Sequence, residues 1–281
     1  MNFIKNLKIK AKEKDSIVCM GMDPVLDRIP IKGNPEEVIT TFYMDILEEM
    51  EQQNIWPAIV KPNIAFYEQY GFEGLKALKQ LIPAYQKKGI PVLLDAKRGD
   101  IGKTSKAYAK NLFEFWKASA ATIAPYMGSD SVGPFIDWCK KGKGVYILVR
   151  TSNKGAVDIQ NLKVGGKPVY LKTCEKIVEW YEPGISVVVG ATYPKELEEI
   201  SEFFVKSGKE IPMLIPGVGS QGGTAQEVVG ALKKTGNPLE IHRINSSSGI
   251  NYAYEKEDTD DYAGAAVRAI ERLNKEIGFS N

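Results

Sequence analysis

The sequence predicts an α/β protein that folds as a single (β/α)₈ TIM barrel, and three observations support this fold class. Short runs of β-branched and other apolar residues alternate with longer amphipathic stretches along the whole 281-residue chain. This alternation is typical of parallel βα units. Eight such units are present, and a barrel of eight units takes about 250 residues as one domain. No linker or low-complexity segment divides the chain, so residues 1–281 are expected to form one domain.

The expected strands are runs of six or seven mostly apolar residues. In chain order they lie at 17–22, 57–62, 91–96, 119–125, 144–150, 185–191, 212–217 and 241–246. Amphipathic helices are expected between them, most clearly at 35–53, 74–89, 193–208 and 260–278. A doubly wound open sheet is the alternative, because it is built from the same βα units.

Two segments stand outside this regular alternation. In residues 1–15 lysines interrupt the apolar residues every two or three positions. This pattern predicts a short amphipathic N-terminal helix, and it lacks the apolar core of a secretory signal. The longest connection, residues 152–168, is rich in Gly, Asn and Lys and indicates a mobile loop after the fifth strand.

Composition argues against several classes of partner. The chain has 37 Lys and Arg against 35 Asp and Glu, a net charge of +2, which gives no reason to expect nucleic acid or an anionic membrane. No apolar run approaches the roughly 18 residues of a membrane span. Cys19, Cys139 and Cys174 are widely spaced and, with the single His242, form no zinc pattern. No metal is expected, and a reducing cytoplasm fits this cysteine usage.

The segment LLDAKRGDIGKT at 93–104 carries the clearest chemical signal. Asp95 and Lys97 are two residues apart, so on a strand they point to the same side. They lie at the C-terminal end of the strand, where barrels build their active sites. Gly99 permits a tight turn and Asp100 follows it. In isolation, the same spacing would also fit a solvated cluster of salt bridges.

Two further strands end in ionisable groups. Lys61 ends the second strand, and Asp23 follows the first. Because the C-terminal ends of barrel strands meet at one rim, Asp23, Lys61 and Asp95 are expected to face the same space. Three consecutive strands with this property favour an active site over a chance arrangement.

Two loops at the other side of the rim suggest a phosphate site. The seventh strand ends in LIPGVGSQGGT at 214–224, where four glycines and Gln221 allow backbone amides to approach a ligand. The eighth strand ends in INSSSGI at 244–250, whose small residues also expose amides. The loops after strands seven and eight are the recurrent phosphate site of barrels.

The motif DAKRGDIG, with Thr104 downstream, resembles orotidine 5′-phosphate decarboxylases. VKPNIAFYE, GMDP, RTSN with a later DIQ, GATYP and PGVGSQGG are similar to the other strand-end motifs of that family. The similarity extends from the first strand to the eighth, and the RTSN form with its long loop resembles one subgroup. The resemblance implies a homodimeric barrel that decarboxylates orotidine 5′-phosphate to UMP in de novo pyrimidine biosynthesis without metal or cofactor.

By motif match, the resemblance also implies roles for individual residues. Lys61, Asp95 and Lys97 form a charged array in one subunit, with Lys97 as proton donor to C6 of the pyrimidine. Asp100, Ile101 and Thr104 reach into the site of the partner subunit, and Asp100 completes the catalytic set. Asp23 binds the ribose, Ser152 contacts the pyrimidine amide, and Gln221 lies between base and phosphate. The other substrate-binding candidates are Pro216, Gly222, Ser247 and Ser248.

One position departs from the family pattern. Ser248 stands in NSSSGI where the family usually has an arginine that would hold the phosphate with two hydrogen bonds. Arg243 lies five residues earlier, inside the strand, and is not an evident replacement. The departure leaves a degenerate, non-catalytic nucleotide-binding barrel as one alternative. The other is a related phosphosugar decarboxylase or synthase, which would use a metal and a carboxylate where Lys61 stands.

Overall fold

The computed structural model describes residues 1–219 and 222–279, and its centre is a single sheet of eight parallel strands. The eight strands lie close to the segments expected from the sequence. They are β1 (Val18–Met22), β2 (Ile59–Pro62), β3 (Leu93–Arg98), β4 (Ala120–Ile123), β5 (Gly144–Arg150), β8 (Ile185–Val189), β9 (Met213–Pro216) and β10 (Arg243–Ser246).

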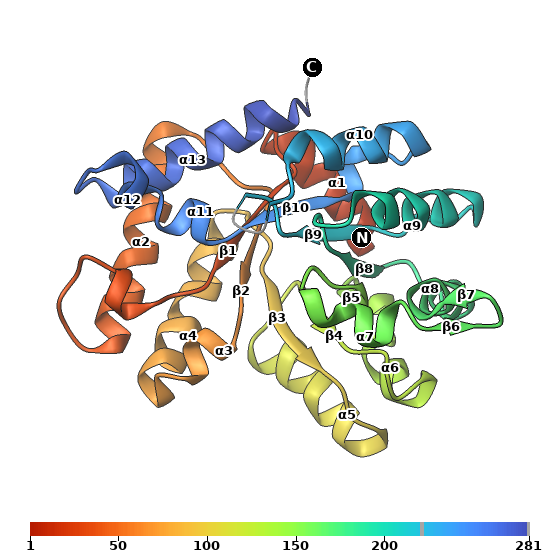
Figure 1. Ribbon diagram of the computed structural model, residues 1–281. Coiled ribbons are helices and arrows are strands. Elements are labelled where there is room, and N and C mark those ends of the chain that lie inside the picture. Colours follow the sequence, from red (N-terminus) through yellow and green to blue (C-terminus); the bar gives the residue numbers. More distant parts are fainter. Residues whose placement is uncertain (220–221, 280–281) are drawn as a thin grey trace.

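The sheet closes on itself. Its strand order is β2-β1-β10-β9-β8-β5-β4-β3. The two outermost strands are joined by parallel bridges from Val60 to Val92 and from Asn63 to Asp95. The ribbon accordingly shows strands around a common centre with helices outside (Figure 1). The predicted barrel is confirmed, and the open doubly wound sheet is excluded.

Helices cover the outside of the barrel. In the part of the chain described here, they are α1 (Phe3–Glu13), α2 (Pro35–Gln53), α3 (Ala65–Glu68), α4 (Gly71–Lys87), α5 (Gly102–Lys110), α6 (Ser129–Ile136), α7 (Val157–Gln160), α8 (Val169–Glu179), α9 (Pro194–Lys206), α10 (Ala225–Thr235), α11 (Ser248–Asn251), α12 (Ala253–Glu257) and α13 (Tyr262–Ile277). The predicted helix at 35–53 has the same bounds in the structure, because Asn34 caps its start and Asn54 ends it in a left-handed conformation. Within residues 1–219 and 222–279 no helix is long and apolar enough to cross a membrane.

The predicted N-terminal helix closes one end of the barrel. Phe3 and Leu7 of α1 pack in a buried cluster with residues of the barrel strands, among them Cys19 and Tyr146. The buried guanidinium of Arg243 donates hydrogen bonds to the carbonyls of Leu7 (2.6 Å), His242 (2.6 Å) and Glu240 (3.0 Å). Arg243 therefore fastens α1 where the strands begin, and the opposite rim is left open for a site.

The connection at 152–168, for which the composition predicts a mobile loop, contains short regular elements. It contains a 3₁₀ turn at Lys154–Ala156, then α7, and then a hairpin of β6 (Lys163–Val164) and β7 (Lys167–Pro168). Gln160 fastens it to the end of β5, since its Oε1 accepts from the Thr151 amide (2.9 Å) and its Nε2 donates to Thr151 Oγ1 (2.8 Å).

Candidate active site

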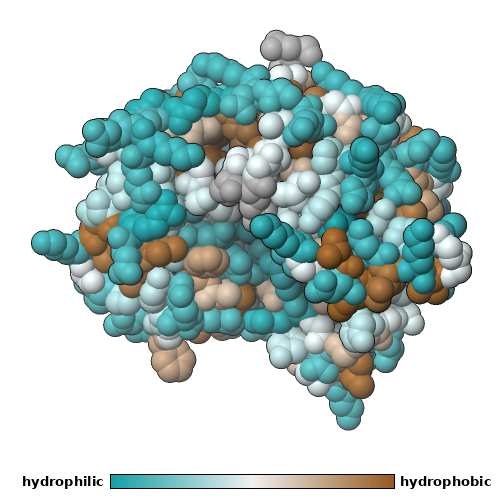
Figure 2. All heavy atoms as spheres, viewed as in Figure 1, coloured by the Kyte–Doolittle hydropathy of each residue, from teal (hydrophilic) through white to brown (hydrophobic). Residues whose placement is uncertain are grey.

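A cavity of about 610 Å³ opens at the C-terminal rim of the barrel. Figure 2 shows it as a hollow of hydrophilic residues near the centre of the face. Every strand contributes a lining residue, from within the strand or just beyond its C-terminal end. These residues are Asp23, Lys61, Asp95, Thr122, Thr151, Val188, Pro216 and Asn245. The rim therefore holds the site where the sequence placed it.

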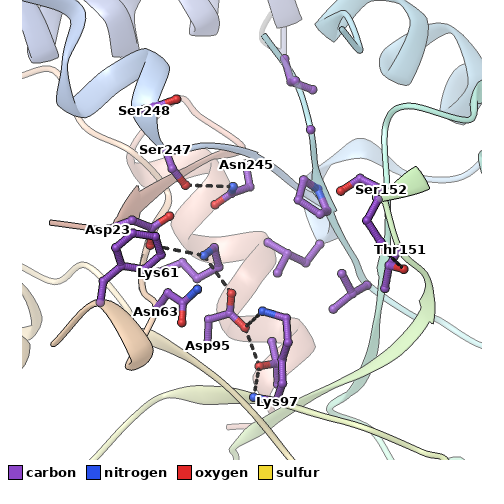
Figure 3. A pocket seen from close by; sticks show the side chains of 18 of the residues that line it. Asp23, Lys61, Asn63, Asp95, Lys97, Thr151, Ser152, Asn245, Ser247 and Ser248 are labelled. Atoms are coloured by element: carbon purple, nitrogen blue, oxygen red, sulfur yellow. Dashed lines mark hydrogen bonds and ion pairs between the residues drawn. The ribbon is translucent and has the colours of Figure 1, made fainter. Parts of the chain in front are cut away.

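The charged residues expected to converge do lie together (Figure 3). Lys61 Nζ is 3.0 Å from Asp95 Oδ2, and Lys97 Nζ is 2.8 Å from Asp95 Oδ1. Asp23 Oδ1 is 3.9 Å from Lys61 Nζ. One carboxylate thus stands between two ammonium groups, with a second carboxylate behind the buried lysine.

At the two buried members of the array, the attraction of opposite charges outweighs the effect of burial on the pKa. Burial alone would lower the pKa of Lys61, but Asp23 and Asp95 raise that pKa above its ordinary value. Burial would raise the pKa of Asp95, but Lys61 and Lys97 hold that pKa well below its usual range. The side chain of Lys61 is only 5% exposed, whereas that of Lys97 is 49% exposed. Lys97 is therefore the ammonium group that a molecule in the cavity can reach.

The sequence analysis missed Thr122, which holds this corner of the site. The pairing of β3 with β4 shifts register between Leu94 and Arg98, and Lys97 has a left-handed backbone with φ of +43°. Thr122 Oγ1 accepts hydrogen bonds from the amides of Ala96 (3.0 Å) and Lys97 (2.9 Å) and donates one to Asp95 Oδ1 (2.8 Å). The only sequence signal was a hydroxyl in an otherwise apolar strand.

Several of the predicted substrate-binding residues line the same cavity, namely Asp23, Ser152, Pro216, Ser247 and Ser248. Two glycines allow the loops that carry them to approach the neighbouring strands. A Cβ on Gly190 would lie 2.8 Å from the Ser152 backbone, and a Cβ on Gly21 would overlap the Ser247 side chain.

Other candidates do not line the cavity of their own chain. Asp100, Ile101 and Thr104 are absent from its lining; Ile101 and Thr104 are exposed, and the Asp100 carboxylate accepts a hydrogen bond from the Ile101 amide (2.7 Å). These residues precede or begin α5, which extends outward from the rim (Figure 1). Gly222 is exposed and also lies outside the lining. Gln221 falls outside the described residues.

The polar cavity residues that the sequence analysis did not single out are Arg28, Asn63, Thr122, Thr151, Asn153, Asn245 and Tyr252. The Asn245 Oδ1 and Asp23 Oδ1 atoms are buried and accept no hydrogen bond from any described residue. An acceptor left unpaired in this way costs free energy unless a ligand or water donates to it. The cavity wall therefore has unused acceptors on the β1 and β10 side.

The single histidine does not belong to the charged array of Lys61, Asp95 and Lys97. His242 is fully buried, its Nδ1 accepts a hydrogen bond from the Met213 amide (3.0 Å), and burial lowers its pKa to about 3. Within residues 1–219 and 222–279 no three His, Cys, Asp or Glu side chains are grouped so that they could hold a metal ion.

Comparison with known proteins gives consistent matches. The profile of the "Orotidine 5′-phosphate decarboxylase / HUMPS family" matches residues 35–258. The chain is 38% identical to the orotidine 5′-phosphate decarboxylase of Halorubrum lacusprofundi, over 99% of each chain. It is similar to the structure of Leishmania donovani OMP decarboxylase, with 33% identity, 99% of each chain covered and a TM-score of 0.77. It also matches 57% of the chain of Leishmania donovani UMP synthase, again with 33% identity and a TM-score of 0.79, using 99% of its own length.

Proposed function

The chain belongs to the orotidine 5′-phosphate decarboxylase family, and we propose that its rim cavity converts orotidine 5′-phosphate to UMP in pyrimidine biosynthesis. The protein is a carboxy-lyase. Its family profile also includes HUMPS proteins, but relatives with 38–42% identity over most of the chain are named as the decarboxylase. The phosphosugar alternative and the non-catalytic alternative are therefore not favoured.

The observation that carries the proposal is the half-exposed Lys97 ammonium, held 2.8 Å from a buried carboxylate that a second lysine already neutralises. Decarboxylation breaks the bond between C6 and the carboxyl carbon and leaves the electron pair on C6, while CO₂ departs. An ammonium fixed near C6 stabilises that charge as it develops and then donates its proton to C6. UMP is formed, and Lys97 regains a proton from water.

The other members of the array have supporting roles. Asp95 lies beside the departing carboxylate and disfavours the bound ground state, while it keeps the Lys97 ammonium in place. Lys61 holds Asp95 ionised from the buried side. All steps use this chain's own charged groups, so the reaction is proposed to need no metal and no cofactor.

The remaining lining residues are proposed to bind the substrate. The position of Asp23 in the cavity lining, directly after β1, supports a contact with a ribose hydroxyl. Ser152, two residues beyond β5, is proposed to contact the pyrimidine amide, and Pro216 also lines the cavity. Ser247, Ser248 and Gly222 are proposed to lie at the phosphate end, and Gln221 between base and phosphate.

The active form is proposed to be a homodimer with shared sites. Asp100, Ile101 and Thr104 lie outside their own cavity, which fits a position in a partner's site. Exposed apolar side chains surround this loop, with Ile101 53%, Tyr126 89% and Met127 43% exposed. Such a cluster is typical of a surface that another protein covers.

Mixing two inactive variants tests the shared site. Lys97→Ala and Asp100→Ala proteins, once exchanged into hybrid dimers, are expected to regain activity because one of the two sites then contains both native residues. Subunit exchange is verified by mass-tagged subunits. No recovered activity in verified hybrids would reject the shared site.

The activity itself is tested by the loss of ultraviolet absorbance when purified protein with EDTA is added to orotidine 5′-phosphate. Turnover that persists in EDTA is expected. No turnover, with UMP still bound, would favour the degenerate nucleotide-binding barrel, and turnover that disappears with EDTA would overturn the metal-free proposal.

The cellular setting follows from the same features. Cys19, Cys139 and Cys174 are unpaired and buried, which supports a reducing cytoplasm. The near-neutral charge supports a small molecule and a second copy of the chain as the partners, rather than nucleic acid or a membrane.

A further inference from the structure

The cavity has three lining cations among the described residues, and two of them are committed to one carboxylate. Lys61 and Lys97 both contact Asp95. The third is Arg28, in the 3₁₀ turn Leu26–Arg28 that follows β1. It makes no ion pair with the charged array and pairs instead with Glu255, which does not line the cavity.

Arg28 is held rigidly by one edge of its guanidinium. Its Nε donates to Glu255 Oε1 (2.8 Å), and its Nη2 donates to Glu255 Oε2 (2.6 Å). Its Cζ lies 3.8 Å from the centre of the Tyr252 ring. Tyr252 is itself anchored, because its hydroxyl accepts from the Val25 amide (2.8 Å) and donates to the Asp23 carbonyl (3.1 Å).

This arrangement leaves the other edge unused. Nη1 donates to no described residue, although it carries two N–H groups of the planar fork that binds carboxylates and phosphates. The guanidinium is thus already oriented, and a ligand that binds it does not have to immobilise a flexible side chain.

Arg28 lies on the side of the cavity opposite Lys97. The amide of Tyr252, on which Arg28 stacks, donates to the Ser248 carbonyl (3.1 Å), and β1 pairs directly with β10. Ser247 and Ser248 lie at the top of the close-up and Lys97 at the bottom (Figure 3). Arg28 and the serine loop therefore line one side of the cavity, and the charged array lines the other.

We propose that the Nη1 edge of Arg28 binds the 5′-phosphate of the substrate and supplies the cationic contact that Ser248 lacks. The inference rests on the proposed function for the identity of the substrate. The phosphate would lie between Arg28 and the amides of the serine loop, with Glu255 on the far edge of the guanidinium. Loss of a charged hydrogen-bond donor of this kind typically lowers affinity about tenfold to hundredfold.

The test compares Arg28→Gln with wild type on ligands with and without phosphate. The variant is expected to raise the Kd of UMP and the KM of orotidine 5′-phosphate about tenfold to hundredfold. For orotidine, which has no phosphate, the kcat/KM of the variant should stay within about threefold of the wild-type value. That change is much smaller than the loss expected for the phosphorylated ligands. A purely structural role would weaken both substrates together, so this selectivity is the decisive readout.

Two further variants sharpen the test. Arg272→Gln removes a similar surface arginine, paired with Glu257 and absent from the cavity lining, and should change neither constant. Ser248→Arg, added to Arg28→Gln, should restore most of the lost UMP affinity by placing a cation on the neighbouring loop. Equal losses for nucleotide and nucleoside, or an unchanged Kd for UMP, would refute the role of Arg28.

Failure of the proposed function would look different. If the wild-type protein binds UMP but does not decarboxylate orotidine 5′-phosphate, the decarboxylase proposal is wrong. The Arg28 contact is then tested by calorimetry with UMP and with inorganic phosphate. Both ligands should bind more weakly to Arg28→Gln than to wild type. Unchanged binding of both in that variant would overturn the inference on its own.

Discussion

Replacing Thr122 with valine should damage both the stability of the barrel rim and the turnover of the enzyme. Valine has nearly the shape of threonine, so the change removes the hydroxyl and little else. That hydroxyl accepts from the amides of Ala96 and Lys97 and donates to Asp95. The perturbation therefore acts on the two residues closest to the proposed chemistry without removing either.

The expected size follows from the three hydrogen bonds. A fully buried amide left without an acceptor costs about 1–3 kcal/mol, so the two part-buried amides should lower the free energy of unfolding by at most about 2–6 kcal/mol. The lower half of this range is favoured because the Lys97 side chain borders the open cavity, where water can reach. The lost bond to the Asp95 carboxylate is worth about 1.5–3 kcal/mol, which corresponds to roughly tenfold to hundredfold in kcat if it is needed only in the transition state.

The backbone of Lys97 adds a further reason. Its left-handed conformation, with φ of +43°, costs about 1–3 kcal/mol for a residue other than glycine. The Thr122 hydroxyl compensates part of that cost through the Lys97 amide. Without the Thr122 hydroxyl, the backbone at the register shift between β3 and β4 is expected to relax. The Lys97 ammonium then moves away from its position at the cavity.

The assay measures kcat by the absorbance of orotidine 5′-phosphate and stability by denaturant unfolding of the same preparations. Thr122→Ser keeps the hydroxyl, so its kcat should stay within about threefold of the wild-type value. This is a smaller change than the decrease expected when the hydrogen bond to Asp95 is lost. Thr173→Val removes a hydroxyl that bonds only to the Val169 carbonyl of its own helix and should not change kcat. If Thr122→Val turns over as fast as Thr122→Ser, the hydroxyl does not position the array and the reasoning is wrong.

Three further predictions concern single residues. Lys97→Ala should abolish turnover with an unchanged melting temperature, because no other group in the cavity is placed to protonate C6; residual activity within tenfold of wild type would reject Lys97 as the acid. Ser248→Arg in the wild-type background should lower the KM for orotidine 5′-phosphate by adding a second cation beside Arg28, leave kcat almost unchanged and do little for orotidine; an unchanged KM would show that position 248 does not reach the phosphate. Arg243→Leu should lower the free energy of unfolding by at least about 3 kcal/mol, since two buried carbonyls and one part-buried carbonyl lose a charged donor, while the KM stays the same; a raised KM at normal stability would show instead that Arg243 serves the phosphate.

The sequence by itself determined the alternation of strands and helices and the placement of charge along it. The period of apolar residues located all eight barrel strands, because buried parallel strands are apolar on both faces. Asp23, Lys61 and Asp95 were expected at one rim since parallel strands of a barrel share their direction. The serine at position 248, where the family usually has an arginine, was likewise visible in the motif NSSSGI.

Only the tertiary structure decided which residues from distant segments meet. Thr122 and Asp95 are 27 residues apart and Arg28 and Glu255 are 227 apart, so no local pattern relates either pair. The buried contacts of Arg243 with α1 likewise appear only once the N-terminal helix is packed into the barrel. Hydrogen bonds and ion pairs depend on distances of a few ångströms, which the fold fixes between segments that sequence periodicity treats as independent. The left-handed backbone at Lys97 has the same origin, because the shift in pairing with β4 and the Thr122 hydroxyl impose it from a neighbouring strand.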